Sequence, residues 1–156
     1  MLKSIQTEPT REPVTLAEAK QNAAIDHDDD DALVSRMITS ARKHVEMITN
    51  RVLVRQKWRL YLDHGLQAFE LQPATVQEVD QIQYVDTDGN TQTLATSVYT
   101  VDIPRQAVYL AYNQSWPATR TVRNAAWADV WAGYYKTDSS PIDVLADMPE
   151  DIKQAT

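Results

Sequence analysis

The sequence predicts an α+β fold in which two helices come first and a β-rich region follows. Apolar residues recur at helical spacing before residue 50, whereas residues 52–135 contain short alternating segments separated by turn-forming residues. A helical signal returns over residues 141–156. We expect one domain over residues 1–156, with a helical part at 13–50, a β-rich insertion at 52–135 and a C-terminal helical segment at 141–156.

A polar tail is expected through Arg11, and the first helix is expected over residues 16–24. Thr15 and Glu18 have capping-box spacing, in which the threonine oxygen accepts from a helix amide and the glutamate reaches back to the cap. Pro13 favours an extended approach to this helix.

A longer helix is predicted over residues 28–48, ending near Asn50. Its start carries acids, which the helix dipole favours, and Asp26 or Asp28 is the expected N-cap. The apolar positions with 3–4–3 spacing are Val34, Met37, Ile38, Ala41, Val45 and Ile48. The polar positions of the opposite face are Ser35, Arg36, Thr39, Arg42, Lys43 and Glu46.

Period-two alternation predicts the strands that follow. Residues 57–62 form one such segment, and residues 79–85 and 91–94 form a hairpin around a glycine-containing turn at 86–90. Shorter strands are expected at 69–71, 98–101 and 107–110. In the segment 126–132, Trp127, Asp129 and Trp131 share one face, which suggests either a core rim or an oligomer interface.

The end of the sequence gives a weaker signal. Pro149 stands where a helix favours proline, in its first turn, and acidic residues follow it. Since only eight residues remain from Pro149, such a helix needs a partner to dock on.

Composition narrows the classes of function. The 156 residues have a net charge of −7, which argues against a protein that grips nucleic-acid phosphates. With no cysteine, thiolate metal sites and cysteine nucleophiles are excluded. No signal peptide or membrane span is apparent, so we expect a protein that is made in the cytoplasm and needs no membrane.

The run Asp26–Asp31, interrupted by His27, is the one candidate for metal chemistry. Hard cations need several oxygen ligands that converge, whereas consecutive helical carboxylates point about 100° apart. A helix start is therefore the favoured interpretation, and a metal-dependent enzyme is the alternative. The glycine turn at 86–90 lacks the carboxylates of a calcium loop, and no phosphate-binding motif is present. We expect no catalytic residue and no cofactor.

Several segments in order resemble the head–tail connector family of long-tailed phages, also called adaptor or head-completion proteins. They are "EPVTLAEAK", "DHDDDDALVSRMITSARKHVEMITNRVLVRQKWRLYLD", "IQYVDTDGNTQTL", "YNQSWPATR" and "VWAGY". The resemblance extends from Pro13 to Gln154. It implies a structural virion protein at the neck, without enzymatic activity, and a helical bundle carrying a β-rich insertion.

The resemblance also implies partners. We expect a homo-oligomeric, twelvefold ring under the portal protein, which extends the DNA channel without binding DNA specifically. The ring then gives the stopper or a tail-completion protein a docking surface. A stopper or terminator protein of the same neck is the alternative. Family members usually continue past the segment "MPEDIKQA" into a long apolar helix, so the resemblance assigns no portal-contact residue.

Site residues follow as expectations within this framework. Neighbouring subunits are expected to meet at Trp127, Trp131, Arg36 and Arg42. Partner proteins are expected to contact Asp86, Asp88, Gly89, Pro149 and Ile152. Because acidic walls repel phosphates, the DNA channel is expected to be faced by Asp28, Asp29 and Asp30.

Overall fold

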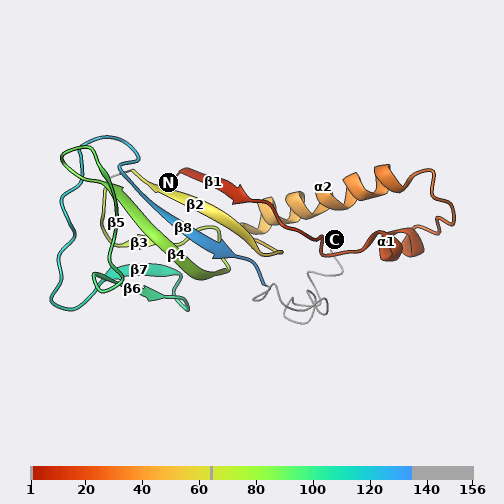
Figure 1. Cartoon of the computed structure of the whole chain (residues 1–156). Coiled ribbons are helices and arrows are strands. Elements are labelled where there is room, and N and C mark those ends of the chain that lie inside the picture. The colour runs from red at the N-terminus through yellow and green to blue at the C-terminus, as the bar shows by residue number, and fades with distance from the viewer. Residues whose placement is uncertain (1, 64, 135–156) are drawn as a thin grey trace. The chain divides into compact units, whose positions relative to one another are not determined.

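The computed structural model describes residues 2–63 and 65–134, and these fall into two compact units (Figure 1). The sheet unit consists of the chain up to Glu8 together with Gln56–Ala132. The helical unit consists of Pro9–Arg55 with the described residues after Ala132. The chain therefore passes between the units three times. The expected helical segment at 141–156 lies outside the described residues.

The sheet unit contains two antiparallel sheets (Figure 1). Five strands have the order β1 (Leu2–Thr7), β2 (Gln56–Leu62), β8 (Ala126–Ala132), β4 (Val76–Val85) and β5 (Thr91–Thr93). Three short strands have the order β3 (Phe69–Glu70), β7 (Ala107–Leu110) and β6 (Tyr99–Asp102). Helices followed by antiparallel strands confirm the predicted α+β class.

The core of the sheet unit follows from the alternation in β2 and β8. Leu60 pairs with Ala128, and Trp58 pairs with Val130, so these side chains share one face of the five-stranded sheet. The fully buried hydrophobic residues of the unit include Leu60, Leu71, Val76, Ile82, Val108, Ala126, Ala128, Val130 and Ala132. The alanines of β8 thus belong to the buried face, as the sequence pattern predicts.

Strand β1 corrects the prediction of an N-terminal polar tail. Residues Leu2–Thr7 pair with β2, from Leu2 opposite Tyr61 to Thr7 opposite Lys57. Most of its side chains are exposed, because β1 forms the edge of the sheet and is held mainly by backbone hydrogen bonds. A local hydrophobic pattern does not reveal such a strand.

The helical unit begins with α1 (Leu16–Asn22), whose capping box is present as predicted. The Thr15 Oγ1 atom accepts from the Glu18 amide at 3.2 Å, and the Glu18 carboxylate accepts from the Thr15 amide at 2.8 Å. The helix stops at Asn22, two residues before the predicted end.

Helix α2 (Asp31–Thr49) starts three residues later than predicted. Its N-cap position is Asp30, which makes no side-chain cap hydrogen bond, so the assignment of Asp26 or Asp28 as N-cap was wrong. The Asp28 carboxylate is instead bound by Lys20 at 2.6 Å. The helix ends at Asn50, which has the left-handed conformation typical of such stops (φ 50°).

The helices bury few of their side chains. No residue of α1 is buried, and in α2 only Val34 and Arg42 are. The predicted apolar positions Met37 and Ile48 are exposed instead. Within the described ranges, no helix is long and apolar enough to span a bilayer.

Candidate interaction surfaces

The face of the five-stranded sheet opposite the buried alanines carries aromatic and polar side chains in three cross-strand rows. We call it the polar face. Its rows, read across β2, β8 and β4, are Lys57–Trp131–Glu78, Arg59–Asp129–Gln81 and Tyr61–Trp127–Gln83. Directly opposite residues on antiparallel strands point the same way, so each row is a set of touching neighbours.

Asp129 is the charged centre of the polar face. Its side chain is only 3% exposed, and its two oxygens accept from Arg59 at 2.7 and 2.9 Å and from Gln81 at 3.1 Å. Burial alone would raise the pKa of Asp129, but the hydrogen bonds from Arg59 and Gln81 outweigh it and hold the pKa below its usual range. The bidentate pair therefore fixes β2 against β8.

Both tryptophans of β8 are half-buried under a cation. The Arg59 guanidinium lies 5.4 Å from the Trp127 ring centre, and the Lys57 ammonium lies 5.7 Å from that of Trp131. The Trp127 ring nitrogen donates to Gln83 at 3.0 Å, while Lys57 also pairs with Asp80 at 2.6 Å. Partly exposed tryptophan and arginine on a rigid, internally bonded sheet are typical of protein interfaces.

The β4–β5 turn forms a second exposed surface. The Asp86 carboxylate accepts from the amides of Asp88 and Asn90 and from the Gln92 side chain, at 3.1, 2.8 and 2.9 Å. These bonds, that from Gln92 first, lower the pKa of Asp86. Asp86 therefore shapes the turn, which leaves the exposed Asp88 and Gly89 as its outward-facing residues.

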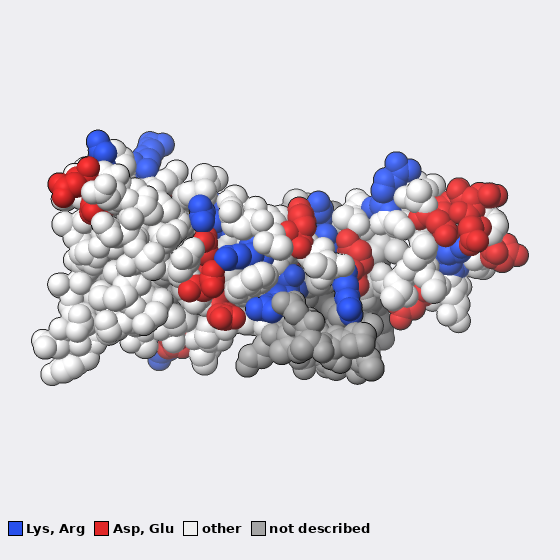
Figure 2. Space-filling model, viewed as in Figure 1, with Lys and Arg blue, Asp and Glu red and all other residues white. Residues whose placement is uncertain are grey.

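Basic side chains adjoin the same turn. A Cβ atom at Gly89 would lie 2.7 Å from the Arg120 guanidinium, and Arg120 with Arg123 lines an open hollow beside Asp63 and Gly65. Figure 2 shows acidic and basic side chains next to one another over this turn. The turn thus offers both signs of charge to a partner.

The segment from Asp26 to Asp30 forms an acidic turn between α1 and α2. Lys20 reaches it from α1 and pairs with Asp28 at 2.6 Å and with Asp31 at 2.7 Å. The hydrogen bonds to these carboxylates raise the pKa of Lys20, and Lys20 in turn lowers that of Asp28. In the described part of the chain, no group of three or more carboxylate or histidine side chains could hold a metal ion. The ammonium group of Lys20 therefore lies beside the carboxylates that the metal-enzyme alternative assigned to a metal ion.

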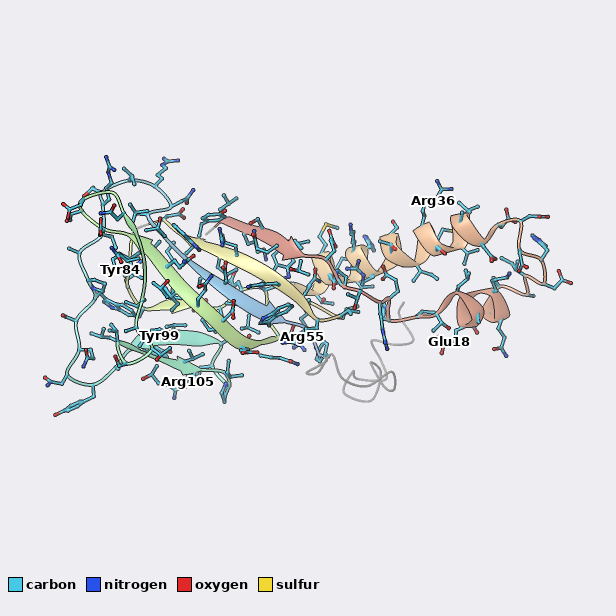
Figure 3. All side chains as sticks on the ribbon, in the orientation of Figure 1. Glu18, Arg36, Arg55, Tyr84, Tyr99 and Arg105 are labelled. Atoms are coloured by element: carbon cyan, nitrogen blue, oxygen red, sulfur yellow. The ribbon has the colours of Figure 1, made fainter. Side chains whose placement is uncertain are left out.

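The two arginines expected at a subunit contact differ in their surroundings. Arg36 is exposed and projects from α2 on the side away from α1 (Figure 3). Arg42 is 3% exposed at its side chain and pairs with Glu12 at 2.6 Å and Glu46 at 2.9 Å. Burial opposes its charge, but the two carboxylates outweigh this and raise its pKa. The side of α2 that was predicted to be polar is therefore partly buried within the helical unit.

Two of the expected contact residues are not among the described residues, and one ion pair was not predicted. Pro149 and Ile152 lie outside the described residues. The pairing of Arg42 with Glu12 is not evident from the sequence pattern, because 30 residues separate them in the chain. The only local signal was the placement of Glu12 beside Pro13, just before α1.

Comparison with known proteins identifies the family. The sequence profile of the phage gp6-like head–tail connector proteins matches residues 13–101, which is more than half of the chain. The chain belongs to this head–tail connector family. It is therefore a structural protein of the virion neck, as the resemblance in the sequence implied. No curated protein matches the sequence significantly.

Solved structures with a similar fold come from gene transfer agent particles. A chain in the neck of an empty particle, computed with C6 symmetry, has a TM-score of 0.72 and 21% identity, with 99% of this connector and 78% of that chain covered. A chain in the virion of the native particle has a TM-score of 0.73 and 20% identity, with 99% and 79% covered. A chain in the native neck, computed with C12 symmetry, has a TM-score of 0.68 and 19% identity, with 99% and 78% covered. At this identity the likeness concerns the fold.

Proposed function

We propose that the connector forms a ring of identical subunits below the portal, with the twelvefold arrangement that matches the portal. The observation that carries this proposal is membership of the head–tail connector family over residues 13–101. It is supported by a shared fold with chains from necks that were computed with C12 and C6 symmetry. The ring extends the DNA channel and offers the stopper or a tail-completion protein a docking surface. No catalytic step belongs to this role.

Subunit contacts are assigned to the polar face through Trp127 and Trp131, and to α2 through Arg36. The half-exposed rings and the exposed guanidinium support this assignment. We retain Arg36 without Arg42, because the Arg42 charge is already met by Glu12 and Glu46 in the same chain. Heterologous contacts of this kind, between different faces of one subunit, close into rings.

Contacts with other neck proteins are assigned to the β4–β5 turn, at Asp88 and Gly89, with Asp86 holding its shape. Pro149 and Ile152 complete this assignment from the sequence. The acidic turn, including Asp28, Asp29 and Asp30, is assigned to the channel wall, where negative charge prevents DNA from adhering.

The experiment is to mix the purified connector with portal rings and measure the complex by sedimentation and electron microscopy. We expect a ring of connector subunits coaxial with the portal. The absence of any complex over a wide range of concentrations and salt would exclude the proposed role.

A further inference from the structure

Helix α2 carries an apolar stripe that the described residues leave uncovered. The exposed fractions are 44% for Leu33, 59% for Met37, 71% for Met47 and 68% for Ile48. At 100° per residue these four side chains lie within about 100° of one another around the helix axis. The stripe extends for about 22 Å, from Leu33 to Ile48, and the exposed polar residues Ser40 and His44 lie within it between Met37 and Met47.

The stripe is separate from the part of α2 that faces its own unit. Val34 is buried, and Val45 packs beside the buried pair Leu53 and Val54. Both lie on the flank of the stripe, since one residue along a helix turns the side chain by about 100°. Soluble subunits rarely expose aligned large apolar side chains of this kind, and such a stripe on a helix fits a helical partner.

The charged side chains beside the stripe indicate what kind of partner docks on it. Arg36 and Lys43 are exposed on its other flank, whereas the acidic turn Asp26–Asp30 lies at the N-terminal end of the same helix. Figure 2 shows the acids gathered at the turn, with cationic side chains among and beside them, and Lys20 is the cation that pairs with Asp28 and Asp31. Opposite charges at separate places on one surface complement a displaced copy of that surface.

We propose that the α2 stripe docks on the helical unit of the neighbouring copy in the ring. The displaced copy brings the exposed Asp26, at the start of its acidic turn, toward Arg36 and Lys43, which leaves Asp28, Asp29 and Asp30 to face the channel. The four apolar side chains pack between the two units. This contact is heterologous, so it repeats around an axis. The inference deepens the ring proposed above and rests on it.

Photo-cross-linking tests the contact directly. Because the chain has no cysteine, Met37→Cys carries a benzophenone maleimide at a single site, and Ser35→Cys on the other side of α2 is the matched control. Complexes with portal are assembled from equal amounts of isotopically heavy and light connector. We expect mixed heavy–light cross-links from position 37 into residues 16–49 of another copy, at least tenfold above those from position 35. Cross-links from position 37 within one chain, or to portal or stopper, would overturn the proposal.

Substitutions that introduce a charge into the stripe test the docking of α2 separately from the formation of the ring. Met37→Glu and Ile48→Glu are expected to reduce assembly on the portal at least tenfold, whereas Ser35→Glu assembles like the wild type. Since both stripe residues are exposed in the subunit, their melting temperatures should match the wild type. If the wild type fails to assemble, the proposed function falls. If the wild type and both stripe variants assemble equally, only the docking of α2 is overturned.

Discussion

Two buried charged side chains of this connector stabilise their own unit through ion pairs. Arg42 joins the segment before α1 to the middle of α2, and Asp129 joins β2, β8 and β4. In both cases a buried charge has at least two partners, so the cost of removing it from water is offset. Replacing Arg42 or Asp129 therefore removes the charge that its partners share.

The Arg42→Met variant should lose about 3 kcal/mol of unfolding free energy, because Glu12 and Glu46 are left without their cation. Urea denaturation followed by far-UV circular dichroism measures this. Arg36→Met on the same helix is the control and should change the free energy by less than about 0.5 kcal/mol, since Arg36 is exposed. Equal effects of the two substitutions would contradict the role given to Arg42.

The lowered pKa of Asp129 predicts that the free energy of unfolding decreases as the pH falls into the acidic range. Its folded pKa lies below the ordinary value of 3.8, so the unfolded chain takes up the proton first as pH falls. The stabilisation is full above the unfolded pKa and is lost as pH falls through the folded pKa. Asp129→Asn should therefore cost about 2 kcal/mol at neutral pH and much less in acid. Denaturation curves of both proteins across this range measure the difference, and a constant gap would refute the prediction.

At the scale of elements, backbone conformation decides where strands and helices stop. Gly133, directly after β8, has φ 132°, and a Cβ atom there would lie 2.5 Å from the Arg55 nitrogen and 2.7 Å from its Cα. Gly89 also has a positive φ, 94°, but its Cβ would meet only the end of the Arg120 side chain. One glycine therefore faces fixed backbone, and the other faces a group that can move.

The variant Gly133→Ala should lose about 3 kcal/mol or more, because strain in φ adds to a clash with backbone. Gly89→Ala should lose about 1–2 kcal/mol, from backbone strain alone. Thermal unfolding of the two variants provides the comparison. A loss at Gly89 as large as that at Gly133 would show that the close approach to Arg55 is unimportant.

The elements differ in how far the sequence predicts them. The Thr15–Glu18 cap, the stop at Asn50 and the alternation of β8 are encoded by neighbours within a few residues, and each is present as predicted. Strand β1 depends on β2, more than fifty residues away, so no local pattern reveals it. The pairing of Arg42 with Glu12 and the exposure of the α2 stripe also depend on residues that are distant in the sequence, so a local pattern does not predict them.

At the scale of the whole molecule, the net charge of −7 is concentrated in places such as the acidic turn. A chain with this charge is expected to have little affinity for DNA, which is consistent with the proposed place of the acidic turn in the channel wall. The metal-binding alternative for the same acids is less suited to this arrangement, because the single ammonium group of Lys20 already pairs with Asp28 and with the adjoining Asp31.

Reversing charge in the acidic turn should create affinity for DNA. Portal complexes of the double variant Asp29→Lys with Asp30→Lys are expected to bind duplex DNA with an affinity that falls between about 50 and 200 mM salt. Fluorescence anisotropy of labelled DNA measures the binding. The control is Asp88→Lys, in the β4–β5 turn, which should leave the weak binding of the wild type unchanged. Equal gains in both proteins would argue against the channel-facing assignment.

The three passages of the chain between its units have a mechanical consequence. They follow the end of β1, precede the start of β2 and follow the end of β8, and these strands are neighbours with Thr7 opposite Lys57 and Gln56 opposite Ala132. All three tethers therefore leave from one end of a hydrogen-bonded trio. A pull along these strands is shared by three covalent linkers, and one protease cut leaves the units joined.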